Sequence, residues 1–223
     1  MMEPHEFWQE IHPGDHATPG PYQDRFPARL PDGRVLFLPI RRLGETDRGI
    51  ASLILNQTAF AVEAVLADLL AEQLAEYAPE VIVGMPTLGL SLARAVAERL
   101  GHRRYVALGT SRKFWYDEDL SVPLTSITSP GAQKRLYLDP RMLPLLSGAK
   151  ICLIDDVISS GTSISAGLDL LQGAGLRLVC VGAAMLQTRR WQEALGERGV
   201  LAVGVIRSPL LRFGAAGWDL AEE

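Results

Sequence analysis

The hydrophobic pattern of the chain alternates between two spacings from about residue 58 onward. Apolar residues first recur at helical spacing as far as Tyr77, which predicts a long helix with Thr58 as its N-cap. Short apolar runs and helical segments then alternate. The predicted strands are 81–84, a run that begins at Arg104, 151–154, a run that begins at Leu176 and one that begins at Leu201; the predicted helices are 88–100, 162–171 and a short one near Trp191.

The predicted strands are apolar on both faces, which is typical of parallel strands covered by helices. Their alternation with helices predicts an α/β fold, with a parallel twisted sheet and helices on both of its faces. Residues 58–206 form this predicted core. Residues 1–57 are rich in Pro and Gly, and the segment 22–40 predicts a β-hairpin that turns at residues 30–33. Residues 207–223 follow the core as a separate C-terminal segment.

Composition and charge exclude several classes of protein but do not identify a function. The 223 residues are 48% hydrophobic and 22% charged, which is ordinary for a globular protein, and no apolar run reaches membrane-spanning length. The net charge of −4, without a basic stripe, argues against a nucleic-acid binder, and the lack of a spanning apolar run argues against a membrane partner. Cys152 and Cys180 lie in apolar strands and suit buried free thiols, so we expect a cytoplasmic protein.

One segment of thirteen residues, 151–163, carries the chemistry. A buried strand leads into the adjacent carboxylates Asp155 and Asp156, and a loop of small hydroxyl residues around a glycine follows. Amide groups near such a glycine converge on one point, and the start of the next helix adds a positive dipole, so the loop predicts a site for a phosphate monoester. The residues of the predicted phosphate site are Ser159, Ser160, Gly161, Thr162 and Ser163.

The two aspartates need a different partner, because negative charges repel phosphate. A carboxylate pair suits vicinal hydroxyls of a sugar beside a hydrated Mg²⁺ ion, so a ribose 5-phosphate fits the layout. The alternative is that the aspartates only cap the next helix, since acidic residues often end parallel strands. The strand before the pair and the hydroxyl-rich loop after it favour the ligand site.

This segment resembles the signature for 5-phosphoribosyl 1-pyrophosphate (PRPP) in the type I phosphoribosyltransferases. The resemblance implies that Asp155 and Asp156 bind the ribose hydroxyls of PRPP, and that residues 159–163 wrap its 5-phosphate. It also implies a Mg²⁺ ion held mainly by PRPP, with the two aspartates acting through water. The activity implied is transfer of the phosphoribosyl group to a nucleobase.

Two further loops acquire roles from the same resemblance. The loop of Pro86, Thr87, Leu88 and Gly89 follows the first core strand and is expected to bind pyrophosphate, although alone it is as consistent with a plain strand-to-helix turn. The long connection 109–148 predicts a hairpin with a mobile tip. In the family such a loop closes over PRPP, and the matching basic pair is Arg112 and Lys113.

The resemblance also implies a homodimer, in which this loop acts across the interface. For the later pair Lys134 and Arg135, a solvated surface position is as good an interpretation as a binding role.

The acceptor base stays open. Hypoxanthine-guanine members of the family carry an aspartate where this chain has Ser159, so the sequence is closer to adenine-, xanthine- or orotate-type members. In the family the base is read by a hood built from the chain ends, where Phe213 and Trp218 are candidates, although aromatic residues in a small subdomain more often form its own core.

Two classes of function remain. One is an enzyme that transfers phosphoribosyl from PRPP to a purine-like or pyrimidine-like base. The other is a regulator that kept the fold as a PRPP sensor and lost catalysis. Both aspartates and the basic pair Arg112 and Lys113 favour the enzyme, and the first 57 residues show no helix-turn-helix pattern.

Overall fold

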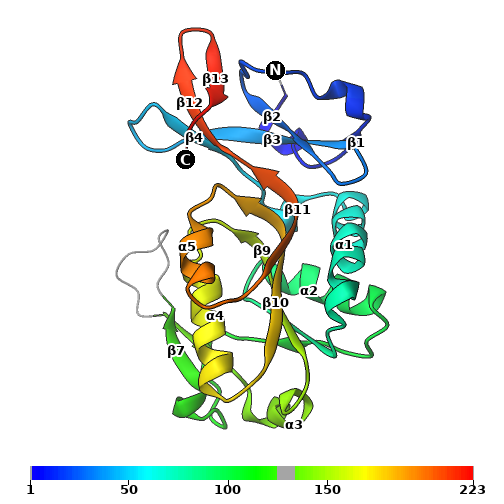
Figure 1. Ribbon diagram of the computed structural model, residues 1–223, viewed down its shortest axis with the longest axis vertical. Helices are drawn as coiled ribbons and strands as arrows, with labels where there is room; N and C mark the ends of the chain where they lie inside the picture. Colours follow the sequence, from blue (N-terminus) through cyan, green and yellow to red (C-terminus); the bar gives the residue numbers. More distant parts are fainter. Residues whose placement is uncertain (1, 125–133, 223) are drawn as a thin grey trace.

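The computed structural model describes residues 2–124 and 134–222, which form an α/β core with a smaller sheet at one end (Figure 1). The core sheet has five strands in the order β11-β10-β9-β5-β6, and every neighbouring pair is parallel. The predicted parallel sheet is therefore confirmed. Its strands are β5 (Val81–Gly84), β6 (Val106–Ala107), β9 (Ile151–Ile158), β10 (Leu178–Gln187) and β11 (Ala202–Ser208).

Helices cover both faces of this sheet, as predicted (Figure 1). On one face, α1 (Phe60–Leu74) packs on β10 and β11, and α2 (Gly89–Arg99) packs on β5 and β9. On the other face, α4 (Thr162–Gly173) packs on β9 and β10 and contacts α5 (Trp191–Gly196). Two separate groups of buried apolar side chains result, one on each side of the sheet.

The start of α1 differs from the sequence-based prediction. The helix begins at Phe60 with Ala59 as its N-cap, whereas the Thr58 hydroxyl donates a 2.8 Å hydrogen bond back to the Leu55 carbonyl. Thr58 therefore closes the preceding 3₁₀ turn (Leu55–Gln57) and does not cap the helix. Because the N-cap position falls on Ala59, no side-chain oxygen accepts from the free amides at the start of the helix.

A second sheet joins the two ends of the chain, and we call it the hood. The predicted hairpin is confirmed as β2 (Arg25–Arg29) paired with β3 (Val35–Arg42). The strand order is β1-β3-β4-β12-β13, and β2 pairs with β3 outside this order. Because β4 pairs with β12, the N-terminal and C-terminal segments share one sheet. The remaining hood strands are β1 (Ile11–His12), β4 (Arg48–Ala51), β12 (Leu210–Gly214) and β13 (Gly217–Leu220).

The long connection 109–148 contains the predicted hairpin. Strands β7 (Ser121–Leu124) and β8 (Lys134–Tyr137) pair antiparallel beside α4, while the expected mobile tip at 125–133 lies outside the described residues. The short helix α3 (Leu143–Leu146) leads into β9. Short 3₁₀ turns lie at Pro4–Glu6, Gly14–His16, Ala75–Tyr77, Glu118–Leu120 and Pro140–Met142.

The structure also places the two cysteines. Cys152 and Cys180 are free and buried on neighbouring strands, as predicted. Among residues 2–124 and 134–222, no helix is both long enough and apolar enough to cross a bilayer.

Candidate active site

The two aspartates lie in the second half of β9, where the strand passes from the core toward the hood. Asp155 is only 8% exposed, and its Oδ1 accepts a 2.9 Å hydrogen bond from the Asp156 amide. Burial raises the pKa of the Asp155 carboxyl well above its usual value, and the neighbouring Asp156 carboxylate raises it further. Burial also raises the pKa of Asp156. No cationic side chain among the described residues forms an ion pair with either aspartate. A buried acidic pair of this kind is typical of a ligand site.

The predicted phosphate loop runs from Ser159 to the first turn of α4. Gly161 has φ +84°, a left-handed conformation that favours glycine, and a Cβ atom there would lie 2.9 Å from Ala194 Cβ of α5. The Ser160 and Thr162 hydroxyls are 3.0 Å apart, and the α4 N-terminus begins at Thr162. Two hydroxyl groups and the N-terminus of α4 therefore lie together, which suits an anion site.

The predicted pyrophosphate loop lies directly against the aspartates. It connects β5 to α2, and the peptide bond between Pro86 and Thr87 is cis. A Cβ atom at Gly89 would lie 2.8 Å from Asp155 Cα and 2.9 Å from its Oδ1. Only glycine lets the start of α2 approach the carboxylate this closely.

Two cavities meet at Asp155. The first, which we call the pyrophosphate-side cavity, has a volume of about 420 Å³. Its lining is Pro86, Thr87, Leu88, Thr110, Leu124, Lys134, Asp155, Asp156, Val157 and Ser163. The second, the hood-side cavity, has a volume of about 470 Å³ and contains the whole phosphate loop. Its other lining residues are Leu43, Ile50, Asp155, Val157, Ile158, Ile164, Gln187, Thr188, Arg190 and Leu210.

The predicted residues of β9, of the phosphate loop and of the pyrophosphate loop therefore come together, with Asp155 at the junction. Gly89 is absent from the lining of the pyrophosphate-side cavity, but it packs on Asp155 just behind it.

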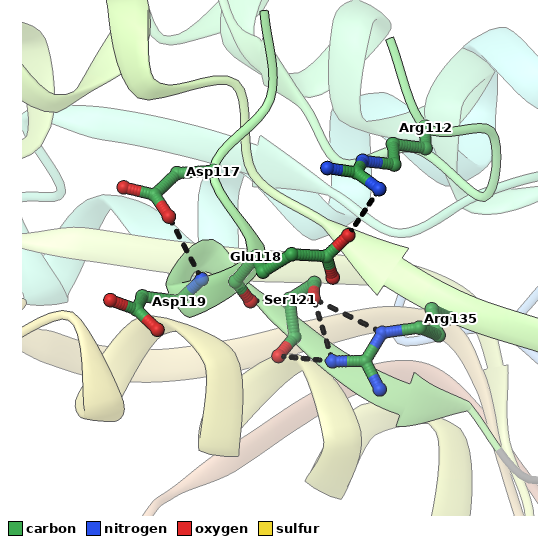
Figure 2. Close-up of polar contacts among 6 residues, drawn as sticks. All are labelled: Arg112, Asp117, Glu118, Asp119, Ser121 and Arg135. Atoms are coloured by element: carbon green, nitrogen blue, oxygen red, sulfur yellow. Dashed lines mark hydrogen bonds and ion pairs between the residues drawn. The ribbon is translucent and has the colours of Figure 1, made fainter. Parts of the chain in front are cut away.

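The predicted lid cations are placed differently. Arg112 forms a 2.6 Å ion pair with Glu118, as Figure 2 shows, and neither Arg112 nor Lys113 lines the pyrophosphate-side cavity. Lys134 lines it instead, from the start of β8. Its neighbour Arg135 donates to the Ser121 hydroxyl and carbonyl, which ties the two strands of the hairpin together (Figure 2). Among the described residues, Lys134 is the cation that lines this cavity, and the role of Arg112 and Lys113 stays a prediction.

The predicted base-binding aromatics lie on the hood away from both cavities. Trp218 is 7% exposed and covers Gly49, and the Arg42 guanidinium lies 4.7 Å from the Phe213 ring centroid. Neither aromatic residue is among those that line the two cavities. The apolar wall of the hood-side cavity comes from Leu43, Ile50 and Leu210.

Sequence reasoning missed Gln187, Thr188 and Arg190 of the hood-side cavity. Gln187 ends β10, and Thr188 and Arg190 follow it at the carboxyl edge of the sheet, where ligands of parallel α/β folds usually bind, so strand order is a signal that points to them. Thr188 has φ +57°, which is rare for a β-branched residue and is found most often near functional sites.

The residues present fit the implied Mg²⁺ ion only if the substrate supplies further ligands. Carboxylate oxygens such as those of Asp155 and Asp156 are the donors that Mg²⁺ prefers. Among the described residues, however, no group of three or more His, Cys, Asp or Glu side chains is placed to hold a metal. An ion held mainly by substrate phosphates, with the aspartates acting through water, stays a prediction.

The chain combines a parallel α/β sheet covered by helices on both faces, a hydroxyl-rich loop after an acidic strand end, and a hood built from both chain ends. Residues 53–200 match the family model described as the phosphoribosyl transferase domain. The chain therefore belongs to the phosphoribosyltransferase family, which confirms the resemblance drawn from its PRPP signature.

Curated relatives are similar over part of their length. The chain is 30% identical over 125 residues to the transcriptional regulator GfcR of Archaeoglobus fulgidus, covering 56% of this chain and 55% of that protein. It is 28% identical over 113 residues to the bifunctional protein PyrR 2 of Lactiplantibacillus plantarum, covering 51% of this chain and 60% of that one. The chain thus spans little more than half the length of these relatives.

Solved structures share the fold. An adenine phosphoribosyltransferase of Trypanosoma brucei, solved with AMP, pyrophosphate and ribose 5-phosphate, has a TM-score of 0.54 at 17% identity, covering 66% of this chain and 65% of that one. The enzyme of Giardia lamblia, solved with 9-deazaadenine, has a TM-score of 0.54 at 19% identity, covering 71% of this chain and 93% of that one. At these identities the likeness establishes the fold alone.

Proposed function

We propose that the protein transfers the 5-phosphoribosyl group of PRPP to a nucleobase and releases pyrophosphate. The observation that carries the proposal is the meeting of the two cavities at Asp155. A ribose held there has room for its pyrophosphate on one side, and for its 5-phosphate and the incoming base on the other. The ribose, the pyrophosphate and the 5-phosphate of PRPP would therefore each lie beside protein groups of complementary chemistry.

Each part of the donor has its own partners in this arrangement. The 5-phosphate binds amides and hydroxyls of the phosphate loop, where Arg190 adds a cation at the rim of the hood-side cavity. The ribose hydroxyls donate to the carboxylates of Asp155 and Asp156. The pyrophosphate lies against the loop that begins at Pro86, within reach of Lys134. A Mg²⁺ ion, when bound between these aspartates and the substrate, supplies charge neutralisation of the departing pyrophosphate.

The reaction needs no protein nucleophile. A ring nitrogen of the base supplies the electron pair that forms the bond to ribose C1, while the C1–O bond breaks and its electron pair leaves with pyrophosphate. The N–H proton that the base loses passes to the departing pyrophosphate or to solvent. The protein aligns the two reactants, neutralises the leaving group and keeps water away from C1. The apolar hood wall suits the last task, because it closes one side of the cavity that contains C1.

A panel of free bases tests the transfer. Purified protein is incubated with PRPP and Mg²⁺ and each base in turn, and pyrophosphate release is followed. We expect turnover with at least one base and a loss of at least 100-fold in the double variant Asp155→Asn/Asp156→Asn, since both ribose contacts are weakened. PRPP binding without turnover on any base would refute the transferase.

That negative result would favour the second candidate, a regulator that senses PRPP. The relative from Archaeoglobus is named a transcriptional regulator. A sensor would bind PRPP with the same phosphate loop and aspartates of this chain as a transferase would. Calorimetry with PRPP and Mg²⁺ should show binding in either case, so the base panel separates the two: a sensor binds PRPP and consumes none of it with any base. The homodimer and the cytoplasmic location stay predictions.

A further inference from the structure

Gln187 occupies a position that the mechanism above leaves unused. It is the last residue of β10, one position beyond Leu186, which pairs with Ile158 of β9. Its side chain is 5% exposed and lines the hood-side cavity together with Ile50. A buried amide at the wall of a substrate cavity is a candidate for reading the substrate.

The orientation of this amide is fixed. Gln187 Nε2 donates a 2.8 Å hydrogen bond to the carbonyl oxygen of Ala51 at the end of β4. A backbone carbonyl only accepts hydrogen bonds, so the nitrogen end of the amide must face the hood and the oxygen end must face elsewhere. The usual ambiguity between the two ends of a glutamine is therefore removed.

The oxygen end is available to a ligand. Within residues 2–124 and 134–222, Ser208 Oγ is the one buried side-chain polar atom without a hydrogen-bond partner. Gln187 Oε1 accepts no hydrogen bond in that part of the chain, so it has access to the cavity that the residue lines. Gln187 Oε1 is thus a hydrogen-bond acceptor of fixed orientation at the wall of the hood-side cavity.

The neighbouring polar groups do not supply the same selectivity. The Thr188 hydroxyl can rotate and serve as donor or acceptor. Arg190 lies at the phosphate end, because it precedes Trp191, whose Cα would be 3.4 Å from a Cβ atom on Gly161. Asp155 lies at the ribose end, where the two cavities meet. Gln187 is the group with a fixed polarity on the hood side.

We propose that Gln187 selects bases that carry an exocyclic amino group, as adenine does, over their oxo counterparts. The proposal rests on the function proposed above and names its acceptor class. An exocyclic substituent projects beyond the ring and is the first to reach an acceptor on the wall. The amino group of adenine donates to Oε1, whereas the oxygen of hypoxanthine places two acceptors face to face and leaves both unpaired.

Binding of two nucleotides tests the proposal apart from catalysis. Calorimetry compares AMP with IMP, which share the purine ring and the ribose 5-phosphate but differ at this edge of the base. We expect the wild type to bind AMP about 10- to 100-fold more tightly than IMP, since an unpaired buried polar group costs that much. Turnover of adenine against hypoxanthine with PRPP should show the same preference.

Three variants separate reading of the base from support of the hood. Gln187→Met removes both ends of the amide and should bring AMP and IMP within about threefold of each other. Gln187→Lys keeps a donor for the Ala51 carbonyl but has no acceptor, and should favour IMP. Gln172→Met changes an exposed glutamine on α4 and should keep the wild-type ratio. Thermal melting of each variant checks that the hood stays folded.

The outcomes distinguish this inference from the transferase itself. Selective AMP binding without turnover on any base supports the role of Gln187 and removes the transferase. Turnover that favours hypoxanthine, or an AMP preference that survives Gln187→Met, overturns the role and leaves the transferase in place. Failure of the wild type to bind AMP overturns it as well.

Discussion

At the scale of single residues, Asp155 shows how the site is built at the expense of stability. Its carboxyl is buried, and in the free protein no described cation pairs with it. A buried charge without a partner is costly, and the same charge becomes favourable only when a ligand with hydroxyl groups and a cation arrives. Residues that serve function in this way often lower the stability of the unliganded protein.

The variant Asp155→Asn should therefore be more stable than the wild type in the absence of ligand. Asparagine keeps the acceptor for the Asp156 amide but carries no charge. At neutral pH we expect a gain of roughly 1 kcal/mol, or about 2–4 °C in Tm for a chain of this size. PRPP binding should weaken at least tenfold because the charged acceptor is lost. Thermal melting with a chelator present, and calorimetry with PRPP and Mg²⁺, measure the two effects.

The pH dependence of this gain has a defined sign. The folded state raises the pKa of Asp155, so the contribution of this group to stability is complete below the pKa of the unfolded chain and is lost as pH rises through the raised value. The two proteins should thus melt together in acid and separate as pH increases. The exposed Asp219→Asn serves as the control. A gap that is constant with pH would show that burial of the charge is not the cause.

At the scale of elements, the sequence pattern predicted those strands, turns and helices whose residues are neighbours in the chain. The apolar run before Asp155 and the hydroxyl loop around Gly161 lie within one segment, so their strand, turn and helix could be predicted from the sequence. The cation beside the pyrophosphate loop could not be predicted in this way. The prediction for Arg112 and Lys113 stays untested: Arg112 pairs with Glu118 in this structure, and pairing of β7 with β8 places Lys134 at the cavity.

The phosphate loop depends on the packing of α5 as well as on its own backbone. Gly161→Ala should lower stability by about 1–2 kcal/mol, because alanine resists a left-handed conformation, and by more where its Cβ meets Ala194. We also expect PRPP affinity to fall at least tenfold as the amides move apart. Chemical denaturation and calorimetry measure these changes.

Gly101→Ala is the matched control. Gly101 has φ +79°, and no atom lies within 4 Å of a Cβ built there, so it shares the backbone cost without the contact. It should lose stability by a similar backbone amount and bind PRPP as the wild type does. Equal PRPP affinity in the two variants would mean that the loop around Gly161 does not hold the phosphate.

At the scale of the whole molecule, the hood joins segments from opposite ends of the chain above the core, and both termini lie at that end (Figure 1). Ile50 of β4 and Leu210 of β12 are partners across neighbouring antiparallel strands, although 160 positions separate them in the sequence. Side chains of paired residues lie on the same face of a sheet, so the two form one apolar wall. Sequence pattern alone gave no sign of this pairing, and its candidates for the base were Phe213 and Trp218, which it interpreted more readily as core residues of the subdomain.

The position of the base can be tested by comparing two hood residues. Ile50→Ala removes part of the wall of the hood-side cavity and should raise KM for the base about tenfold, the effect of a few methylene groups in an apolar pocket, without changing the affinity for PRPP. Phe213→Ala truncates a side chain that is 45% exposed and packs on Arg42, and should leave both constants within about twofold.

If Phe213→Ala raises KM more than Ile50→Ala does, the base lies against the aromatic pair and the wall formed by Ile50 and Leu210 has another purpose. Because both changes are made in one sheet, a loss common to both variants would instead point to weakening of the hood as a whole, which their melting temperatures would reveal.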